Sequence, residues 1–199
     1  GQFVSTISTT NVVDNHSTSF TINIFEHNQV EGRIGSFVYD AGFSSSSSTD
    51  AISINAGFLH SCLITNENRM KCWGYNAYGQ VGVNHASTVS SPSYTYDTWM
   101  KSTKSMDLGT YHACSIDNES QLWCWGYNNY GQVGIDSTAQ ANSPQLITDF
   151  GNEKILQVSV GAYLTCALTS NWEVFCWGAN NYNQLGVSNS IIGNSQTTP

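Results

Sequence analysis

Six cysteines recur at a spacing that could support either disulfide bonds or a metal site. They are Cys62, Cys72, Cys114, Cys124, Cys166 and Cys176. The two members of each pair are ten residues apart, and successive pairs follow one another by 52 residues. Zinc sites typically use a Cys-x-x-Cys spacing, which this chain lacks. The spacing therefore favours disulfide chemistry over zinc binding.

The sequence between the cysteines of each pair predicts the element that positions them. HSCLI (60–64) alternates polar and apolar residues, TNEN (65–68) is a turn cluster, and RMKCWGY (69–75) is a second β-prone run. A hairpin centred on Glu67 places the two cysteines opposite each other, at a Cα separation of about 4.5–5.5 Å that a disulfide accepts. The predicted bonds are Cys62–Cys72, Cys114–Cys124 and Cys166–Cys176.

Two histidines are candidates for catalysis, but their placement predicts a structural role. His60 and His112 occupy the same position in successive copies, whereas a catalytic residue is needed once, beside a different partner. No carboxylate accompanies them at a fixed spacing as an orienting group. Nucleophile-elbow, phosphate-loop, HExxH and calcium-loop motifs are also absent from the sequence. We therefore expect no enzyme activity, no cofactor and no metal site.

Other residues repeat in step with the cysteines. They are Trp73, Trp125 and Trp177, each followed by Gly74, Gly126 or Gly178, with Gln80, Gln132 and Gln184 further on. A repeated tryptophan could be a platform for stacking a ligand, but it is more often a core residue between neighbouring repeats. Gln80 and Gln132, each preceded by a glycine, are interpreted as turn residues whose amides bond to the backbone. Short strands recur about every ten residues with no convincing helix, and four such strands in about 52 residues make one propeller blade.

The predicted fold is thus all-β, a single propeller-type array over residues 1–199. Its copies are expected at 51–102, 103–154 and 155–199, the last being shorter. Residues 1–50 align as a degenerate copy without cysteines, with FTINIFEHNQVEG over MKCWGYNAYGQVG. The alternative for residues 1–50 is an unrelated N-terminal arm.

The pattern AGFLHSC…CWGYNAYGQVG strongly resembles the regulator of chromosome condensation repeat family. The family's hallmark is Gly-x-x-His followed by Trp-Gly-x-Asn-x-x-Gly-Gln-Leu-Gly, and the resemblance covers residues 54–188. It implies a β-propeller, usually of seven blades. The chain departs from the pattern in its cysteine pairs, in Leu164 where the family has His, and in Asn183 where it has Gly.

The composition of the chain limits which partners and which cellular compartment are expected. Six Lys and Arg against fourteen Asp and Glu give a net charge of −8, and the cations are scattered, which disfavours nucleic acid and anionic membranes as partners. Because no run of 18 apolar residues exists, membrane insertion is not expected. Paired cysteines indicate an oxidising, extracellular compartment. Asn15 and Asn118 begin N-glycosylation sequons that align at the same hairpin turn.

The chain has about four copies of the repeat, fewer than the seven blades usual in the family. An incomplete ring leaves blade faces unburied. The chain could be a fragment, a four-bladed ring, or a subunit completed by other chains. We expect an extracellular, non-enzymatic structural or adhesion module that assembles with copies of itself, as a filament or surface assembly, or with other extracellular proteins or glycans. The alternative is a monomeric propeller that binds a protein or glycan through loops on one face. A nuclear role in nucleotide exchange on a small GTPase, known for the family, is opposed by the acidity, the cysteine pairs and the sequons.

Overall fold

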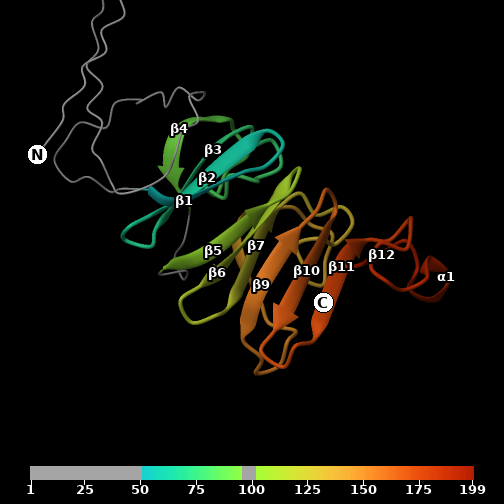
Figure 1. The fold of residues 1–199 in the computed structure, drawn as a ribbon. Helices are drawn as coiled ribbons and strands as arrows, with labels where there is room; N and C mark the ends of the chain where they lie inside the picture. The colour runs from blue at the N-terminus through green and yellow to red at the C-terminus, as the bar shows by residue number, and fades with distance from the viewer. Residues whose placement is uncertain (1–50, 96–101) are drawn as a thin grey trace, which may run out of the picture. The chain divides into compact units, whose positions relative to one another are not determined.

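Within the residues that it describes, the computed structural model contains three antiparallel sheets of four strands each (Figure 1). It describes residues 51–95 and 102–199. In every sheet the hydrogen-bonded neighbours are also neighbours along the chain. This confirms the predicted all-β architecture of four-stranded blades. The predicted degenerate copy at residues 1–50 lies outside the described residues.

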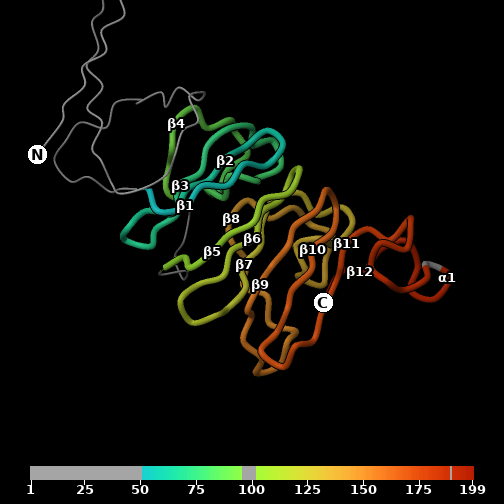
Figure 2. The backbone as a smooth tube through the Cα atoms, viewed as in Figure 1, coloured from blue at the N-terminus to red at the C-terminus, as the bar shows by residue number. Residues whose placement is uncertain are grey.

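Each sheet corresponds to one copy of the sequence repeat, and the backbone passes through them in order (Figure 2). The first contains β1 (Ala51–Ala56), β2 (His60–Thr65), β3 (Met70–Gly74) and β4 (Val89–Tyr94). The second contains β5 (Thr103–Leu108), β6 (His112–Asp117), β7 (Leu122–Gly126) and β8 (Ala141–Ile147). The third contains β9 (Ile155–Val160), β10 (Leu164–Thr169), β11 (Val174–Ala179) and β12 (Ser195–Gln196).

The central hairpin of each sheet carries a disulfide. Cys62 pairs with Cys72 in the register of β2 and β3, and the corresponding cysteines of the other hairpins pair in the same way. The bonds are Cys62–Cys72, Cys114–Cys124 and Cys166–Cys176, each with Cα atoms 4.1 Å apart. The sequence-predicted pairing is therefore confirmed.

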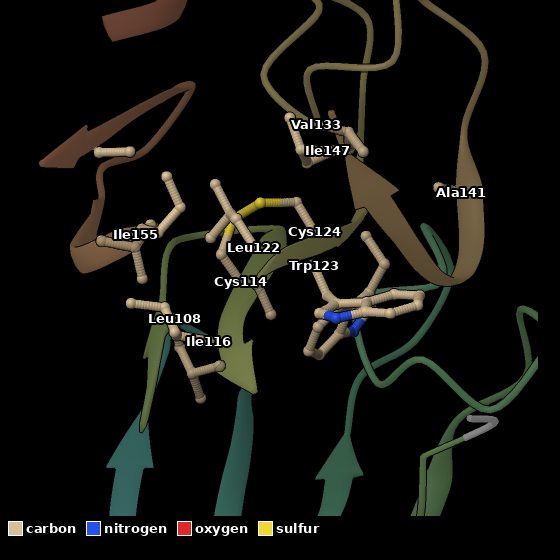
Figure 3. Close-up of a cluster of buried hydrophobic side chains, with 14 of the residues drawn as sticks. Leu108, Cys114, Ile116, Leu122, Trp123, Cys124, Val133, Ala141, Ile147 and Ile155 are labelled. Atoms are coloured by element: carbon tan, nitrogen blue, oxygen red, sulfur yellow. A yellow bond between two sulfur atoms is a disulfide. The ribbon is translucent and has the colours of Figure 1, made fainter. Parts of the chain in front are cut away.

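The core lies around these disulfides and continues between the sheets. Figure 3 shows the Cys114–Cys124 bond of the second sheet among the side chains of Leu122 and Ile155. Ile155 comes from β9, the first strand of the third sheet, so the third sheet closes part of the second sheet's core. Burial of such side chains stabilises the fold by about 1.5–3 kcal/mol each.

The first strands of the three sheets are joined by a carboxylate on β5. Asp107 Oδ1 accepts a hydrogen bond from Asn55 Nδ2 of β1 at 3.1 Å. Asp107 Oδ2 accepts one from the Val160 backbone N–H of β9 at 2.7 Å. One residue of the second sheet thereby bonds both neighbouring sheets, which fixes the order of β1, β5 and β9 side by side.

One element differs from the sequence prediction, which contained no helix. A single turn of helix, α1 (Asn189–Ile192), precedes β12. Ser188 begins it, because the Ser188 carbonyl accepts from the Ile191 N–H at 2.9 Å and its Oγ accepts from the Ser190 N–H at 3.3 Å. A serine cap can form one such turn without any apolar periodicity, so the sequence pattern gave no signal.

Replacing both Cys114 and Cys124 with alanine is expected to lower the free energy of unfolding by about 2–3 kcal/mol, because the unfolded chain regains the freedom of a ten-residue loop. Urea unfolding of the variant and the oxidised wild type measures this difference. Thiol titration of the unreduced, unfolded wild type should find none of the six cysteines free, and detection of free thiols would contradict the assigned bonds.

Candidate functional site

A hydrogen bond from a tryptophan ring to a backbone carbonyl recurs between neighbouring sheets. Trp125 Nε1 of β7 donates to the Gln80 carbonyl at 3.0 Å. Trp177 Nε1 of β11 donates to the Gln132 carbonyl, also at 3.0 Å. Both rings are fully buried, so each contributes a large apolar area while its single polar atom is paired. Each ring thus attaches its sheet to the turn that leaves the preceding one.

The two turns that hold these rings share their structure with the corresponding turn of the third copy. We call residues 79–82, 131–134 and 183–186 the first, second and third indole-binding turns. In each turn the glutamine amide oxygen accepts a hydrogen bond from the backbone N–H of the tyrosine two residues before it. The sequence predicted this use of the amide for Gln80 and Gln132, and the structure confirms it and adds Gln184.

A buried asparagine holds each indole-binding turn in place. Asn128 Oδ1 accepts from the Val133 N–H at 2.8 Å, and its Nδ2 donates to the carbonyls of Ser137 and Ala139 at 2.8 and 2.9 Å. Asn76 and Asn180 make the corresponding bonds. These asparagines were not predicted as functional residues, although they recur 52 residues apart and four residues after a cysteine.

Glycine is required where a ring lies against an indole-binding turn. A methyl carbon on Gly82 would lie 2.7 Å from Nε1 of Trp125, and one on Gly134 would lie 2.6 Å from Nε1 of Trp177. Both glycines also have positive φ angles, +76° and +87°, which side chains disfavour. A larger residue at either position would therefore displace the ring.

The third indole-binding turn has this geometry without a ring among the described residues. Gly186 has a φ of +79°, close to Gly82 and Gly134, yet a methyl carbon there would meet nothing within 4 Å. Asn180 and Gln184 make the same turn-forming bonds as their counterparts. The turn is formed in advance of any contact with a tryptophan.

A second docking point repeats at the hairpin turn of each sheet. The Asn68 carbonyl accepts from the Thr103 N–H of β5 at 2.6 Å, and the Ser120 carbonyl accepts from the Ile155 N–H of β9 at 2.9 Å. Both acceptor residues have positive φ angles near +60°. Trp172, at the same place in the third sheet, also has a φ of +66° and is 77% exposed. Its strained backbone conformation matches the two that bond a following sheet.

Apolar exposure marks the same end of the third sheet. Val174 of β11 is 68% exposed, whereas Met70 and Leu122, which occupy its position in the other sheets, are 1% exposed. Leu122 belongs to the same buried hydrophobic cluster as Phe150 and Ile155 of the chain that follows β8, whereas Val174 is not part of that cluster. The far side of the third sheet is therefore built like a surface that another blade covers.

The first sheet carries the complementary feature. Trp73 of β3, the counterpart of Trp125 and Trp177, is only half-buried among the described residues. The three glycines that follow these tryptophans, Gly74, Gly126 and Gly178, all have positive φ angles at the ends of their strands. The described chain thus has an indole at one end and an indole-binding turn at the other.

The two repeated histidines are buried at the contacts between sheets. Thr165 Oγ1 donates its one hydrogen to the Gln132 carbonyl at 2.8 Å, so His112 Nε2, at 2.9 Å from that oxygen, must be the donor to it. The first contact has Ala113 in place of Thr165, and neither ring nitrogen of His60 has a partner among the described residues. The two contacts are similar in shape but not in hydrogen bonding.

Burial also changes how these histidines titrate. It lowers the pKa of His60 to about 4. Burial, followed by the proximity of His60, lowers the pKa of His112 to about 3, and the Leu164 carbonyl opposes the shift. Both rings are therefore neutral in the folded protein at physiological pH.

The remaining candidate residues lie apart from these contacts. Asn118 is exposed in the turn between β6 and β7, while Asn15 falls outside the described residues. Within residues 51–95 and 102–199, no group of three or more His, Cys, Asp or Glu is placed to hold a metal ion. In the same part of the chain, no helix is long and apolar enough to cross a membrane.

Comparison with protein families identifies the repeat. Two models of the regulator of chromosome condensation (RCC1) repeat match the chain, one over residues 119–168 and the other over residues 51–80, 104–132 and 155–184. Together the matches cover more than half of the chain and fall on all three sheets.

Curated relatives match over the same region. The X-linked retinitis pigmentosa GTPase regulator of Canis lupus familiaris is 31% identical over 137 residues, which are 68% of this chain and 14% of that protein. The ultraviolet-B receptor UVR8 of Arabidopsis thaliana is 28% identical over 138 residues, 69% of this chain and 31% of the relative. The chain thus spans less than a third of either relative.

Solved structures share the fold. Human WBSCR16 is 25% identical with a TM-score of 0.60, over 68% of this chain and 35% of that one. Yeast RCC1 (Prp20), in its complex with Kap60, is 20% identical with a TM-score of 0.64, over 75% of this chain and 36% of that one. Both matches cover about a third of a longer propeller chain.

Gly134→Ala is expected to destabilise the fold by about 1–3 kcal/mol more than Gly186→Ala. The added methyl group at position 134 would displace the Trp177 ring, whereas the one at position 186 would meet no atom. Both changes share the strain of a positive φ angle, about 1 kcal/mol. Urea unfolding at low protein concentration gives the two free energies. Equal losses would show that the ring does not pack on Gly134 as described.

The free energy of unfolding is expected to fall as the pH is lowered from 6.5 towards 4. In that window His60 and His112 bind protons in the unfolded chain but stay neutral in the folded protein, so a fall in pH favours unfolding. Above pH 6.5 both histidines are neutral in both states, and they no longer make the free energy of unfolding depend on pH. His60→Leu, which introduces the residue of the third copy, should flatten the slope. His85→Leu is the control, because His85 is exposed. Equal slopes in the wild type and His60→Leu would contradict the assignment.

Proposed function

We propose that this chain, which belongs to the regulator of chromosome condensation repeat family, is a non-enzymatic assembly module whose copies join end to end outside the cell. Repeat propellers build their blades from one repeating contact, and each blade buries a face against the next. The proposal extends that contact from neighbouring blades of one chain to the end blades of two chains.

The observation that carries the proposal is the third indole-binding turn. It has the φ angle of Gly186, the asparagine bonds and the glutamine bond of the two turns that hold a ring, and no ring lies against it among the described residues. Trp73, half-buried at the other end, is an indole of the type that such a turn accepts. A second copy offers both the ring and the β1–β4 sheet that carries it.

The exposed side of the third sheet also suits a second copy. Val174 would gain the cover that Met70 and Leu122 have, and the Trp172 carbonyl would meet a strand N–H as Asn68 and Ser120 do. Such a contact joins two different surfaces, so it leaves one free end of each kind on the pair. Head-to-tail contacts of this type extend into filaments or close into rings.

The placement outside the cell rests on the cysteines and the sequon. Three disulfides persist in oxidising compartments and are rare in reducing ones. Asn118 is exposed at a hairpin turn, where a glycan would be accommodated. A net charge of −8 makes copies repel one another weakly, so association should strengthen as salt screens the charge.

Sedimentation velocity of the 199-residue chain tests the proposal. Across a dilution series from about 100 µM to about 1 µM, which brackets micromolar dissociation constants, we expect concentration-dependent association. Gly186→Ala should weaken it at least about tenfold, because its methyl group would meet the incoming ring. Gly151→Ala is the matched control, since Gly151 also has a positive φ angle and open space but lies in the β8–β9 loop.

A mixing experiment separates end-to-end assembly from non-specific association. Trp73→Ala retains the third indole-binding turn, and Gly186→Ala retains the ring. Neither variant should assemble alone, whereas an equal mixture should form dimers and stop there. A wild type that remains monomeric at the highest concentration, or equal association of Gly186→Ala and Gly151→Ala, would overturn the proposal.

A further inference from the structure

Seven aromatic rings contact one another in an unbroken series across the three sheets. We call them the aromatic face: Phe58, Tyr75, Tyr78, Tyr111, Tyr127, Tyr130 and Tyr163. Tyr78 of the first sheet lies 4.9 Å, centroid to centroid, from Tyr127 of the second. Tyr130 of the second lies 5.3 Å from Tyr163 of the third. No role was predicted for these residues from the sequence.

The repeat brings these rings to one end of every sheet. The Tyr75 N–H donates to the Leu59 carbonyl at 2.8 Å, which ties the loop after β3 to the loop before β2. The Tyr127 N–H bonds the Tyr111 carbonyl at 2.9 Å in the second sheet, in the same way. Three pairs of these tyrosines are 52 residues apart, so aromatic residues meet in successive sheets: Tyr75 and Tyr127, Tyr78 and Tyr130, and Tyr111 and Tyr163. Phe58 has no aromatic counterpart in the other two copies.

The loop segments next to the aromatic face contain no charged residue. They are residues 57–59, 75–80, 109–111, 127–132, 161–163 and 179–184. Their polar side-chain groups are phenols, amides and one threonine hydroxyl, all of which can donate and accept hydrogen bonds. A ligand that depends on charge finds no partner in these loops.

The rings are accessible but not loose. Phe58 is 67% exposed and Tyr163 is 37% exposed, and the other five are half-buried. Neighbouring planes meet at 53–86°, so ring faces and ring edges alternate along the series. Partial burial raises the pKa of Tyr127, and the phenol of Tyr130 adds to the shift while Asn129 opposes it. The Tyr127 phenol therefore stays protonated and able to donate.

We propose that the aromatic face binds a neutral, linear polysaccharide. The C–H bonds of a sugar ring carry partial positive charge and pack on the negative face of an aromatic ring. Sugar hydroxyls donate and accept, as the phenols and amides beside the rings do. Because one chemical pattern repeats with each sheet, a polymer of repeating sugars can contact several sheets at once. Each sugar–ring contact is weak, but the contacts strengthen one another because the sugars are linked in one polymer.

Other ligand classes fit these loops less well. An anionic or cationic polymer would need opposite charges that the loops lack. A proline-rich peptide in an extended helix also packs on aromatic rings. It presents mainly carbonyl acceptors, so it would pair with the donors of the loops and leave the acceptors of the loops unused. The proline-rich peptide is therefore the competing outcome of the test.

Affinity electrophoresis in native gels tests the proposal, with dextran, hydroxyethyl cellulose and galactomannan as separate probes. At least one should retard the wild-type chain, equally at low and high salt. Phe58→Ala with Tyr163→Ala should weaken retardation at least about tenfold. Tyr94→Ala is the matched control: Tyr94 is 38% exposed, like Tyr163, but lies on β4 and stacks with Arg69 instead of the aromatic face.

Two further measurements keep the outcome decisive. Circular dichroism and thiol titration of each variant establish that the sheets and disulfides are intact. Repeating the gels with Gly186→Ala separates this binding from the proposed assembly, which that variant weakens. The proposal fails if no probe retards the chain, if Tyr94→Ala weakens retardation equally, or if a polyproline peptide binds through Phe58 and Tyr163 while the polysaccharides do not.

Discussion

The arrangement of the sheets depends on pairing one indole N–H. A buried tryptophan supplies much of the apolar contact between neighbouring sheets. Its ring N–H must also donate to an acceptor, because burying it unpaired would offset the free energy gained from the apolar contact. The carbonyls of Gln80 and Gln132 provide it, and the glycine two residues later leaves room for the ring. A buried asparagine in turn holds the carbonyl at the right place. Glutamine, glycine and asparagine thus recur with the tryptophan because they serve one hydrogen bond.

Features that form within one hairpin were predicted from the sequence, whereas contacts between residues far apart along the chain were not. The disulfides and hairpins were predictable, because ten residues with a turn cluster leave one antiparallel register for each pair of cysteines. The acceptors of Trp125 and Trp177 were not, since each lies 45 residues away in another sheet. The aromatic face was missed for the same reason: the spacing of the tyrosines is visible, but their contacts join different positions of the repeat.

Similar shape does not make the two contacts between sheets equal in strength. In the second, Thr165 links His112 to the carbonyl that also receives Trp177. In the first, Ala113 has no hydroxyl, and His60 is left without a partner among the described residues. Asp107 bonds across both contacts, so it does not remove this difference. The first contact is therefore the weaker place in the described array.

The disulfides have a consequence for how such a chain is made. Six cysteines admit fifteen pairings, but each native bond closes within ten residues. A wrong bond between repeats must close a much longer loop, at a greater entropic cost. In an oxidising environment each hairpin can therefore form its own bond, before the next repeat has been synthesised. Whole repeats could be gained or lost during evolution without altering the connectivity of those that remain.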